Sequence, residues 1–363
     1  MKTLNKLTAI SYLISSIGLF GLRLLANEIE LSSIDIAYQQ AVKKIKSSQS
    51  QEGHWKTDFV WGKDIFSEPQ QEVNVWTPSL MVEILEPITQ ETNLEKEMDS
   101  AISYLQDQYE SDGTVRYHGK GSDILPPDAD DTALIWRSAP KEDVDLRKRA
   151  LEKLSKFRTK DNLYPMWLVE GGRKPLNKKR LLPHDINPID TIDMGTQLHI
   201  YIILKKYAPD AAEKLCDAIS QNINNTRYWP YFGHAPWIYV LREIDLHKSG
   251  CAPPRPQKIL KSFVQGQGIY MELVKLLRDV VTAENVDDIQ GDKIKANLTE
   301  IARDDFGVVE KTPLLLYHSN LNTMKKKYRR TYWSKELVYA LWLRLYVESS
   351  RRIDNWDIPK SIQ

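Results

Sequence analysis

The spacing of apolar residues constrains the fold of this chain most. From Ile34 onward, apolar side chains recur every three or four residues, as in Ile36, Ala37, Val42 and Ile45, which places them on one face of an α-helix. Alternation of the β-strand kind is nearly absent. We expect an all-α fold of about ten to twelve helices, with clear helical stretches over residues 130–137, 144–157, 190–206, 211–223, 235–244, 257–277, 294–303 and 334–347.

The chain is predicted to form one large domain over residues 31–363. Its 42% hydrophobic content is enough for a substantial core, and no long polar or low-complexity linker divides it. Residues 1–30 differ from the rest, because Lys2 and Lys6 precede an apolar run over residues 7–22 that ends at Arg23. This segment is short for a membrane span, so it is interpreted as a leader, a membrane anchor or a first helix.

Charge and cysteine content exclude several classes of protein. The 50 Lys and Arg residues balance 49 Asp and Glu residues, which gives no reason to expect a nucleic-acid partner. The two cysteines are Cys216 and Cys251, and His247 is the one histidine close to either. Neither a disulfide framework nor a zinc site is therefore indicated.

A weak repeat joins helix ends to aromatic residues. Its clearest copy begins at Gln49 and runs through Gly53 to Trp55, with looser copies over residues 108–117, 159–167 and 224–229. A Gly or Asn in such a turn can adopt a left-handed backbone, which lets the following aromatic ring fold back over a neighbouring helix end. We expect this turn to serve packing.

The segment Asp128-Ala129-Asp130-Asp131-Thr132 is the main candidate for chemistry. A helix start explains two of its carboxylates. Asp128 can be the N-cap, and the positive end of the helix dipole can stabilise the negative charge of Asp131. Capping does not explain Asp130. A third negative charge in so short a span raises the cost of ionising all three, and one carboxyl can then stay neutral and act as an acid.

Two motifs resemble those of squalene-hopene cyclases and other class II terpene cyclases. Residues Gln49, Gly53 and Trp55 match the Q-x-x-x-G-x-W repeat, and residues 128–132 match the D-x-D-D-T motif. The resemblance implies an α/α barrel that cyclises a linear polyprenyl substrate after protonating an alkene or epoxide. It implies Asp130 as the general acid, with Asp128 and Asp131 as supporting carboxylates.

Such an enzyme makes a carbocation, which needs a dry site lined by aromatic rings. The predicted substrate-binding residues are Trp55, Trp76, Trp136, Trp167, Trp229, Tyr231, Trp237 and Trp333, with Tyr164, Phe232 and Tyr332 as further candidates. Each ring alone can equally be core. Residues 227–237 are the densest aromatic stretch and are broken by prolines, which suggests an edge facing an apolar substrate, a partner or a bilayer.

A second acidic cluster includes His184, Asp190 and Asp193. In one interpretation Asn187 is simply a helix N-cap followed by proline. In the other, Asp190 and Asp193 lie near the barrel mouth with His184 or His199, where they polarise the acid or hold a cation.

The basic stretch over residues 173–180 is either a solvated loop or a site for a diphosphate. No cofactor is expected, except that Mg²⁺ is possible if the substrate is a diphosphate.

The resemblance also has a clear departure. Familiar class II cyclases enclose their substrate between two barrels, whereas this chain has length for one. Either a second subunit or the N-terminal segment closes the cavity, or the pocket is shallow and the chemistry is reduced or lost. Two alternatives remain: a non-catalytic barrel that binds an isoprenoid, another lipid, a glycan or a protein partner, and a glycan-processing α/α barrel. The expected location is peripheral on the cytoplasmic face of a membrane, with secretion by an N-terminal leader as the other possibility.

Overall fold

The computed structural model describes residues 34–61, 68–169, 191–262, 266–318, 330–353 and 356. Most of these residues are helical, as the apolar spacing predicts. One cluster of buried side chains extends from Ile34 to Trp356. The N-terminal segment over residues 1–30 lies outside the described residues.

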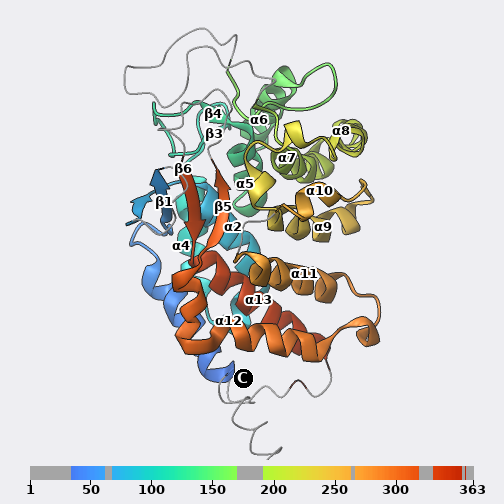
Figure 1. The fold of residues 1–363 in the computed structure, drawn as a ribbon. Helices are drawn as coiled ribbons and strands as arrows, with labels where there is room; N and C mark the ends of the chain where they lie inside the picture. The colour runs from blue at the N-terminus through green and yellow to red at the C-terminus, as the bar shows by residue number, and fades with distance from the viewer. Residues whose placement is uncertain are drawn as a thin grey trace, which may run out of the picture.

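Six helices form a closed inner ring within the described part of the chain. Each contacts the next, and the last contacts the first. Figure 1 shows several of them stacked one above another. The first of them is buried on nearly all sides, since every residue except Glu83 is buried. In ring order they are α2 (Trp76–Leu85), α5 (Ala129–Ser138), α7 (Met194–Tyr207), α9 (Trp237–Ser249), α11 (Gly268–Thr282) and α13 (Glu336–Arg352).

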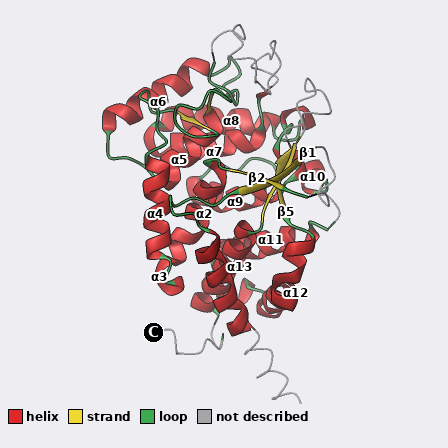
Figure 2. Ribbon diagram, turned by 90° about the vertical axis from the view of Figure 1, so that its left-hand side faces the viewer, coloured by secondary structure: helices red, strands yellow, loops and turns green. Residues whose placement is uncertain are grey.

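An outer layer of helices covers this ring and makes it an α/α barrel. Each outer helix buries one stripe; α4, for example, buries Met98, Ala101 and Leu105, the spacing expected of an amphipathic helix. α4 packs on α2, α6 on α5, α8 on α7 and α12 on α11 (Figure 2). The outer helices are a helix over 34–48, α4 (Glu95–Gln106), α6 (Val144–Phe157), α8 (Pro209–Asn222) and α12 (Gly291–Lys311), which is broken at Arg303–Phe306.

Several short helical turns connect the two layers. The predicted stretch over 257–277 is in fact two helices, α10 and α11, and Gly266, with φ +87°, lies between them. The short elements are η1 (Glu86–Ile88), α3 (Thr89–Thr92), η3 (Thr226–Tyr228), η4 (Phe232–His234), α10 (Gln257–Leu260) and η5 (Val286–Asp288).

A four-stranded antiparallel sheet, which the sequence analysis did not predict, lies where inner helices begin. Its order is β2-β1-β6-β5, formed by β1 (Thr57–Trp61), β2 (Gln70–Glu72), β5 (Leu314–His318) and β6 (Arg330–Ser334). The strands lack alternation because β6 is buried on both faces from Thr331 to Ser334. A second, small pair joins β3 (Val115–Arg116) to β4 (Pro127–Asp128). We call this end of the barrel the sheet end.

The repeat around Gly53 is a packing device, as predicted. Gly53 has φ +94°, and a Cβ there would lie 2.3 Å from the carbonyl oxygen of Ser100, so only glycine fits. The Gln49 side chain donates to the carbonyl oxygens of Gly53 and Glu97. The Trp55 indole N–H donates to the carbonyl of Ile45 at 3.0 Å. The turn thus fastens the first described helix to α4.

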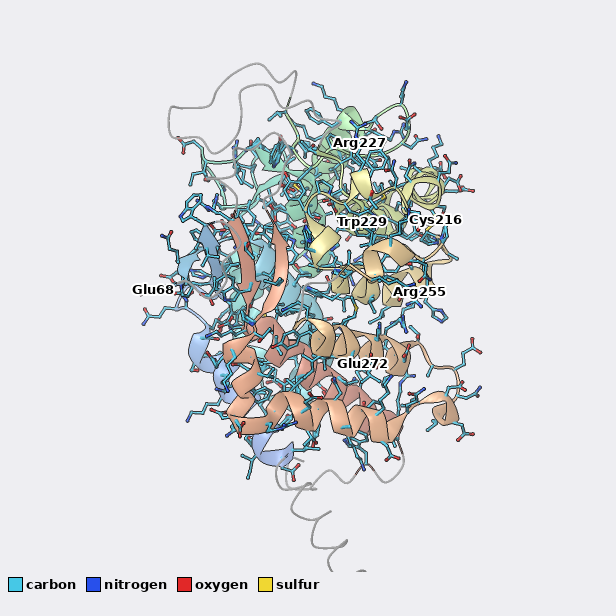
Figure 3. The ribbon with its side chains drawn as sticks, viewed as in Figure 1. Glu68, Cys216, Arg227, Trp229, Arg255 and Glu272 are labelled. Carbon is cyan, nitrogen blue, oxygen red and sulfur yellow. A yellow bond between two sulfur atoms is a disulfide. The ribbon has the colours of Figure 1, made fainter. Side chains whose placement is uncertain are left out.

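The two cysteines form a disulfide, contrary to the expectation that they have no paired role. Cys216 lies on α8 and Cys251 follows α9, with their Cα atoms 5.9 Å apart; Cys216 is labelled on the outer layer in Figure 3. Residues separated by 35 positions are brought together only by helix packing, so spacing could not reveal the pair. The bond links the outer layer to the inner ring.

We expect the Cys216→Ser/Cys251→Ser variant to lose about 3–4 kcal/mol of unfolding free energy, because the disulfide limits the entropy of the unfolded chain. Urea unfolding with and without reductant measures this loss. Reduced wild type should match the double variant, which itself should not respond to reductant. Two free thiols in the denatured, unreduced wild type would show that the bond does not form.

No helix among the described residues is long and apolar enough to cross a bilayer.

Candidate active site

Asp128 ends β4 and is the N-cap of α5. Its Oδ1 accepts the backbone N–H groups of Asp130 at 2.7 Å and Asp131 at 3.3 Å. The Thr132 hydroxyl donates to the carbonyl of Asp128 and accepts the N–H of Val115. The capping role predicted for Asp128 is confirmed, and these bonds fix the first turn of α5 at the sheet end.

Asp130 is held from two neighbouring inner helices. The Trp76 indole N–H, at the start of α2, donates to Oδ2 at 3.1 Å. The His199 Nδ1, on α7, lies 2.6 Å from Oδ1. Burial lowers the pKa of His199, although Asp130 raises it, so the ring is neutral at pH 7. Both carboxyl oxygens therefore have fixed partners in a water-poor setting.

The two flanking carboxyls favour the neutral form. Burial raises the pKa of Asp131 well above its usual range, and Asp128 and Asp130 raise it further. Burial, followed by the charge of Asp130, does the same for Asp128. The Asp131 Oδ1 has no hydrogen-bond partner among the described residues. Burial therefore favours the protonated form of the two carboxyls that flank Asp130.

Aromatic rings surround this end of α5. The Trp76 ring stacks on Phe232 at 5.9 Å between centroids and meets the edge of Tyr317 at 5.3 Å. Tyr317 stacks on Tyr332 at 4.5 Å, and Tyr117 meets both tyrosines edge-on. We call these five residues the aromatic cluster. Faces of this kind stabilise positive charge without supplying a strong nucleophile.

Asp193 positions part of that cluster from the start of α7. Its Oδ1 accepts the N–H of Gly195 at 2.7 Å, and its Oδ2 accepts those of Tyr231 at 2.9 Å and Phe232 at 3.3 Å. A Cβ on Gly195 would lie 2.3 Å from the Phe232 ring. Glycine is needed there for Phe232 to approach α7.

The start of this helix differs from the one expected. α7 begins at Met194 with Asp193 as its N-cap, four residues later than the predicted start at Asp190. His184, Asn187, Asp190 and the basic stretch over 173–180 lie outside the described residues. Of the second acidic cluster, the structure therefore places Asp193 and His199 beside Asp130.

We expect Asp193 to make stability fall as pH rises. Burial raises its pKa from 3.8 to about 7, although three backbone N–H groups lower it. The folded chain keeps a proton that the unfolded chain loses, so the stabilisation is complete below pH 3.8 and disappears as pH rises through about 7. Between pH 5 and 8 this group should remove up to about 3 kcal/mol of unfolding free energy.

Urea unfolding of wild type and Asp193→Asn at several pH values tests this. The difference between the two proteins should change across the range. The control, Asp143→Asn, alters the exposed N-cap of α6 and should follow the wild-type pH dependence. A constant difference between wild type and Asp193→Asn would contradict the assignment.

Four of the predicted substrate-binding tryptophans form hydrogen bonds to the framework. Each donates its indole N–H to a backbone carbonyl: Trp55 to Ile45, Trp136 to Gly113, Trp229 to Ile223 and Trp237 to Leu315. A buried indole N–H needs such an acceptor. The four bonds therefore help to hold helices, turns and a strand of the barrel together.

The remaining four take other positions. Trp76 bonds Asp130 directly, and Trp167 pairs with Asp128 through a backbone bridge. Tyr231 is buried with a hydroxyl that has no partner in the described structure, and burial, with the charges of Asp128 and Asp193, raises its pKa. Trp333 lies in a small separate cluster of buried residues with Val60 and Leu315. Of the eight predicted residues, Trp76, Trp167 and Tyr231 are thus near the carboxyls.

A buried charge network lies below His199. The Arg242 guanidinium, fully buried on α9, binds both oxygens of Glu83 and also Asp245. Arg137 binds Asp245 with two hydrogen bonds. Burial alone would raise the pKa of Glu83, but Arg137 and Arg242 lower it to about 2. No sequence motif indicates this network, because its members come from three different helices.

A cavity of about 530 Å³ opens at the opposite end of the barrel. It includes Glu83, Arg137, Lys206, Asp245 and Arg344 among its lining residues. Most of these residues lie in the last turns of inner helices, where cations complement the helix dipoles and the carboxylates pair with them. Of the charged side chains there, Arg137 forms ion pairs with Glu83 and Asp245. The cavity lies at the C-terminal ends of α2 and α5, whereas Asp130 lies at the N-terminal end of α5.

No group of three or more His, Cys, Asp or Glu side chains in the described ranges is arranged to hold a metal ion.

Comparison with known proteins yields matches in structure alone. No protein-family model matches the sequence, and no curated protein matches it. The fold is similar to type II terpene cyclase MstE from Scytonema without ligand, with TM-score 0.54, 12% identity, and coverage of 89% of this chain and 100% of that one.

Two complexes of MstE variants are also similar. One holds geranylgeranyl dihydroxybenzoate as substrate, with TM-score 0.54, 12% identity and coverage of 90% and 100%. The other holds merosterolic acid A as product, with TM-score 0.58, 12% identity and coverage of 90% and 99%. These likenesses show the fold.

Proposed function

We propose that this protein is a class II terpene cyclase-like enzyme that cyclises a linear polyprenyl substrate, with Asp130 as the general acid. The observation that supports it most is the environment of Asp130. Its carboxyl is buried, both oxygens have polar partners on neighbouring helices, and one of those partners belongs to an aromatic cluster. An acid beside π faces suits alkene protonation.

The first step transfers the proton of Asp130 to one carbon of a terminal alkene, whose π electrons form the new C–H bond. The other carbon becomes cationic and is attacked by the next alkene of the folded chain, which closes a ring. The carboxylate left behind accepts the Trp76 N–H at Oδ2 and, with His199 as its Nδ1–H tautomer, a second N–H at Oδ1. These bonds stabilise the charge that develops in the transition state.

Asp128 and Asp131 support this acid in different ways. Asp128 holds the helix turn that presents Asp130. Burial keeps both flanking carboxyls protonated, which limits the negative charge close to the acid. A site with three ionised carboxylates would hold no proton to give.

The similar structures support a single-barrel enzyme. MstE, whose whole length this chain spans, is described as a type II terpene cyclase with a substrate bound. A second subunit is therefore unnecessary in this proposal. The substrate of MstE is geranylgeranyl dihydroxybenzoate. A polyprenyl chain on a polar head group is therefore the first substrate class to test with this protein. Mg²⁺ enters the proposal only if that head group is a diphosphate.

Incubation of purified protein with polyprenyl substrates in D₂O tests the function. The set should run from geranyl diphosphate to squalene and include prenylated hydroxybenzoates. We expect a cyclised product with deuterium at the protonated carbon. Tight binding of a polyprenyl compound without turnover would favour the non-catalytic alternative, and sugar binding would favour the glycan-processing one.

The location remains a proposal: peripheral contact with the membrane that supplies an apolar substrate. The Cys216–Cys251 disulfide is a bond that persists in oxidising compartments and is rare in the cytosol. The disulfide therefore favours a protein that is exported by its N-terminal segment, rather than one located on the cytoplasmic face of the membrane.

A further inference from the structure

A cyclisation that yields an alkene ends with removal of a proton, and a chain of hydrogen bonds leads away from the aromatic cluster. The Tyr317 hydroxyl donates to the Tyr117 hydroxyl. The Tyr117 hydroxyl donates to Glu72 Oε1 at 2.5 Å. On the far side of Glu72, Arg330 Nη1 donates to Oε2 at 2.9 Å. The chain thus runs from Tyr317 on β5 through Tyr117, the residue after β3, to Glu72 on the edge strand β2.

The direction of these bonds is fixed. Glu72 forms an ion pair with Arg330, and a carboxylate only accepts hydrogen bonds, so the one proton of Tyr117 points to Glu72. Tyr117 must then accept from Tyr317, and the Asn74 amide donates to the same Tyr117 oxygen at 2.8 Å. Among the described residues no donor to Tyr317 Oη is found, so its lone pairs remain available while its proton points away.

Tyr317 also has the right surroundings for contact with a cation. Its ring packs against Trp76, Phe232 and Tyr332, and the Trp76 indole binds Asp130. Part of the surface of Tyr317 is not covered by protein atoms. Burial raises the pKa of Tyr317 and of Tyr117, so both phenols stay neutral and can pass a proton without holding a charge.

We propose that Tyr317 is the base that ends the reaction and that Tyr117 and Glu72 form its proton relay. This inference rests on the proposed cyclase function. A C–H bond next to the cationic carbon breaks, its electron pair forms the alkene, and the proton goes to Tyr317 Oη. The proton of Tyr317 moves to Tyr117, and that of Tyr117 to Glu72, which releases it to water at the sheet edge. Asp130 has given one proton to the substrate, and one proton has left through Glu72 to water; Asp130 regains a proton from water before the next turnover. The substrate is therefore isomerised without an external oxidant or reductant.

Product analysis by gas chromatography and mass spectrometry tests the relay. With Tyr317→Phe we expect substrate consumption within about tenfold of wild type, since protonation by Asp130 is unaffected. The single major alkene should give way to isomeric alkenes or to alcohols formed by water capture. Tyr117→Phe should shift the products in the same direction, although it leaves the Tyr317 ring in place.

Tyr270→Phe is the matched control. Tyr270 is a buried tyrosine on α11, and its hydroxyl donates to the carbonyl of Thr312 at 2.6 Å, outside both the aromatic cluster and the relay. We expect it to keep the wild-type product profile. An unchanged profile for Tyr317→Phe and Tyr117→Phe would overturn the inference, as would an equal shift for Tyr270→Phe.

A measurement without turnover separates this inference from the proposed function. With 3-fluorotyrosine at position 317, the ¹⁹F resonance should shift when Glu72→Gln alters the relay, and should not shift with Asp107→Asn, an exposed change. No response to Glu72→Gln would overturn the relay even if the enzyme cyclises. A response without cyclisation of any substrate would overturn the proposed function, and with it the role of Tyr317 as a base.

Discussion

Asp130→Asn is expected to abolish cyclisation, with a loss of about 10³-fold or more in turnover. Asparagine has nearly the same shape and its amide oxygen can still accept the Trp76 N–H bond that Asp130 accepts. It has no acidic proton to give to an alkene. The measurement is product formation per enzyme under saturating substrate, with the thermal unfolding of the variant recorded in parallel to confirm the fold.

Asp128→Asn is the matched control, since it makes the same change two residues earlier on the same helix turn. Asparagine is as good an N-cap as aspartate, and burial keeps Asp128 neutral, so the amide resembles the native group. We expect activity within about tenfold of wild type. If Asp128→Asn abolished turnover while Asp130→Asn retained it, the acid would be assigned to the wrong residue.

Arg242→Met is expected to lower the unfolding free energy by about 3–5 kcal/mol. Arg242 is fully buried and bonds both oxygens of Glu83. Removing it leaves a carboxylate in the barrel interior with Arg137 as its remaining close cation. The shift of the urea midpoint at constant slope measures the effect.

Arg255→Met is the matched control for burial. Arg255 also binds a carboxylate through two N–H groups, those of Nε and Nη2 to Glu243 at 2.8 and 2.9 Å, but its side chain is 45% exposed. We expect a loss of less than about 1 kcal/mol. The double variant Arg242→Met/Glu83→Gln should regain part of the stability, because it removes the uncompensated charge. Equal effects of Arg242→Met and Arg255→Met would contradict a role for burial.

Local patterns in the sequence predicted the elements that depend on neighbours along the chain. Apolar spacing gave α6 over residues 144–157 with its observed bounds, and α5 to within one residue at each end. The Pro-Pro-Asp start gave the N-cap at Asp128, and the Gly53 turn gave a left-handed residue before a packed tryptophan. Capping, periodicity and turns act over a few residues, so their signals lie within a few residues.

The sheet, the disulfide and most of the site were decided by contacts between distant segments. The strands β1 and β6 pair although they lie near opposite ends of the sequence. Their buried residues do not alternate with exposed ones, so neither strand can be recognised from its own sequence. Among the aromatic candidates, no local signal separates Trp76, which bonds Asp130, from Trp136, which bonds Gly113.

The sequence by itself determined that this chain forms a helical barrel and that Asp128, Asp130 and Asp131 lie together at a helix start. Only the tertiary structure decided which side chains complete the site. His199, Trp76 and Tyr317 reach it from different elements. The physical reason is that helix formation depends on the spacing of apolar residues along the chain, whereas a buried carboxyl depends on whichever donors and rings the closed ring of helices brings to it.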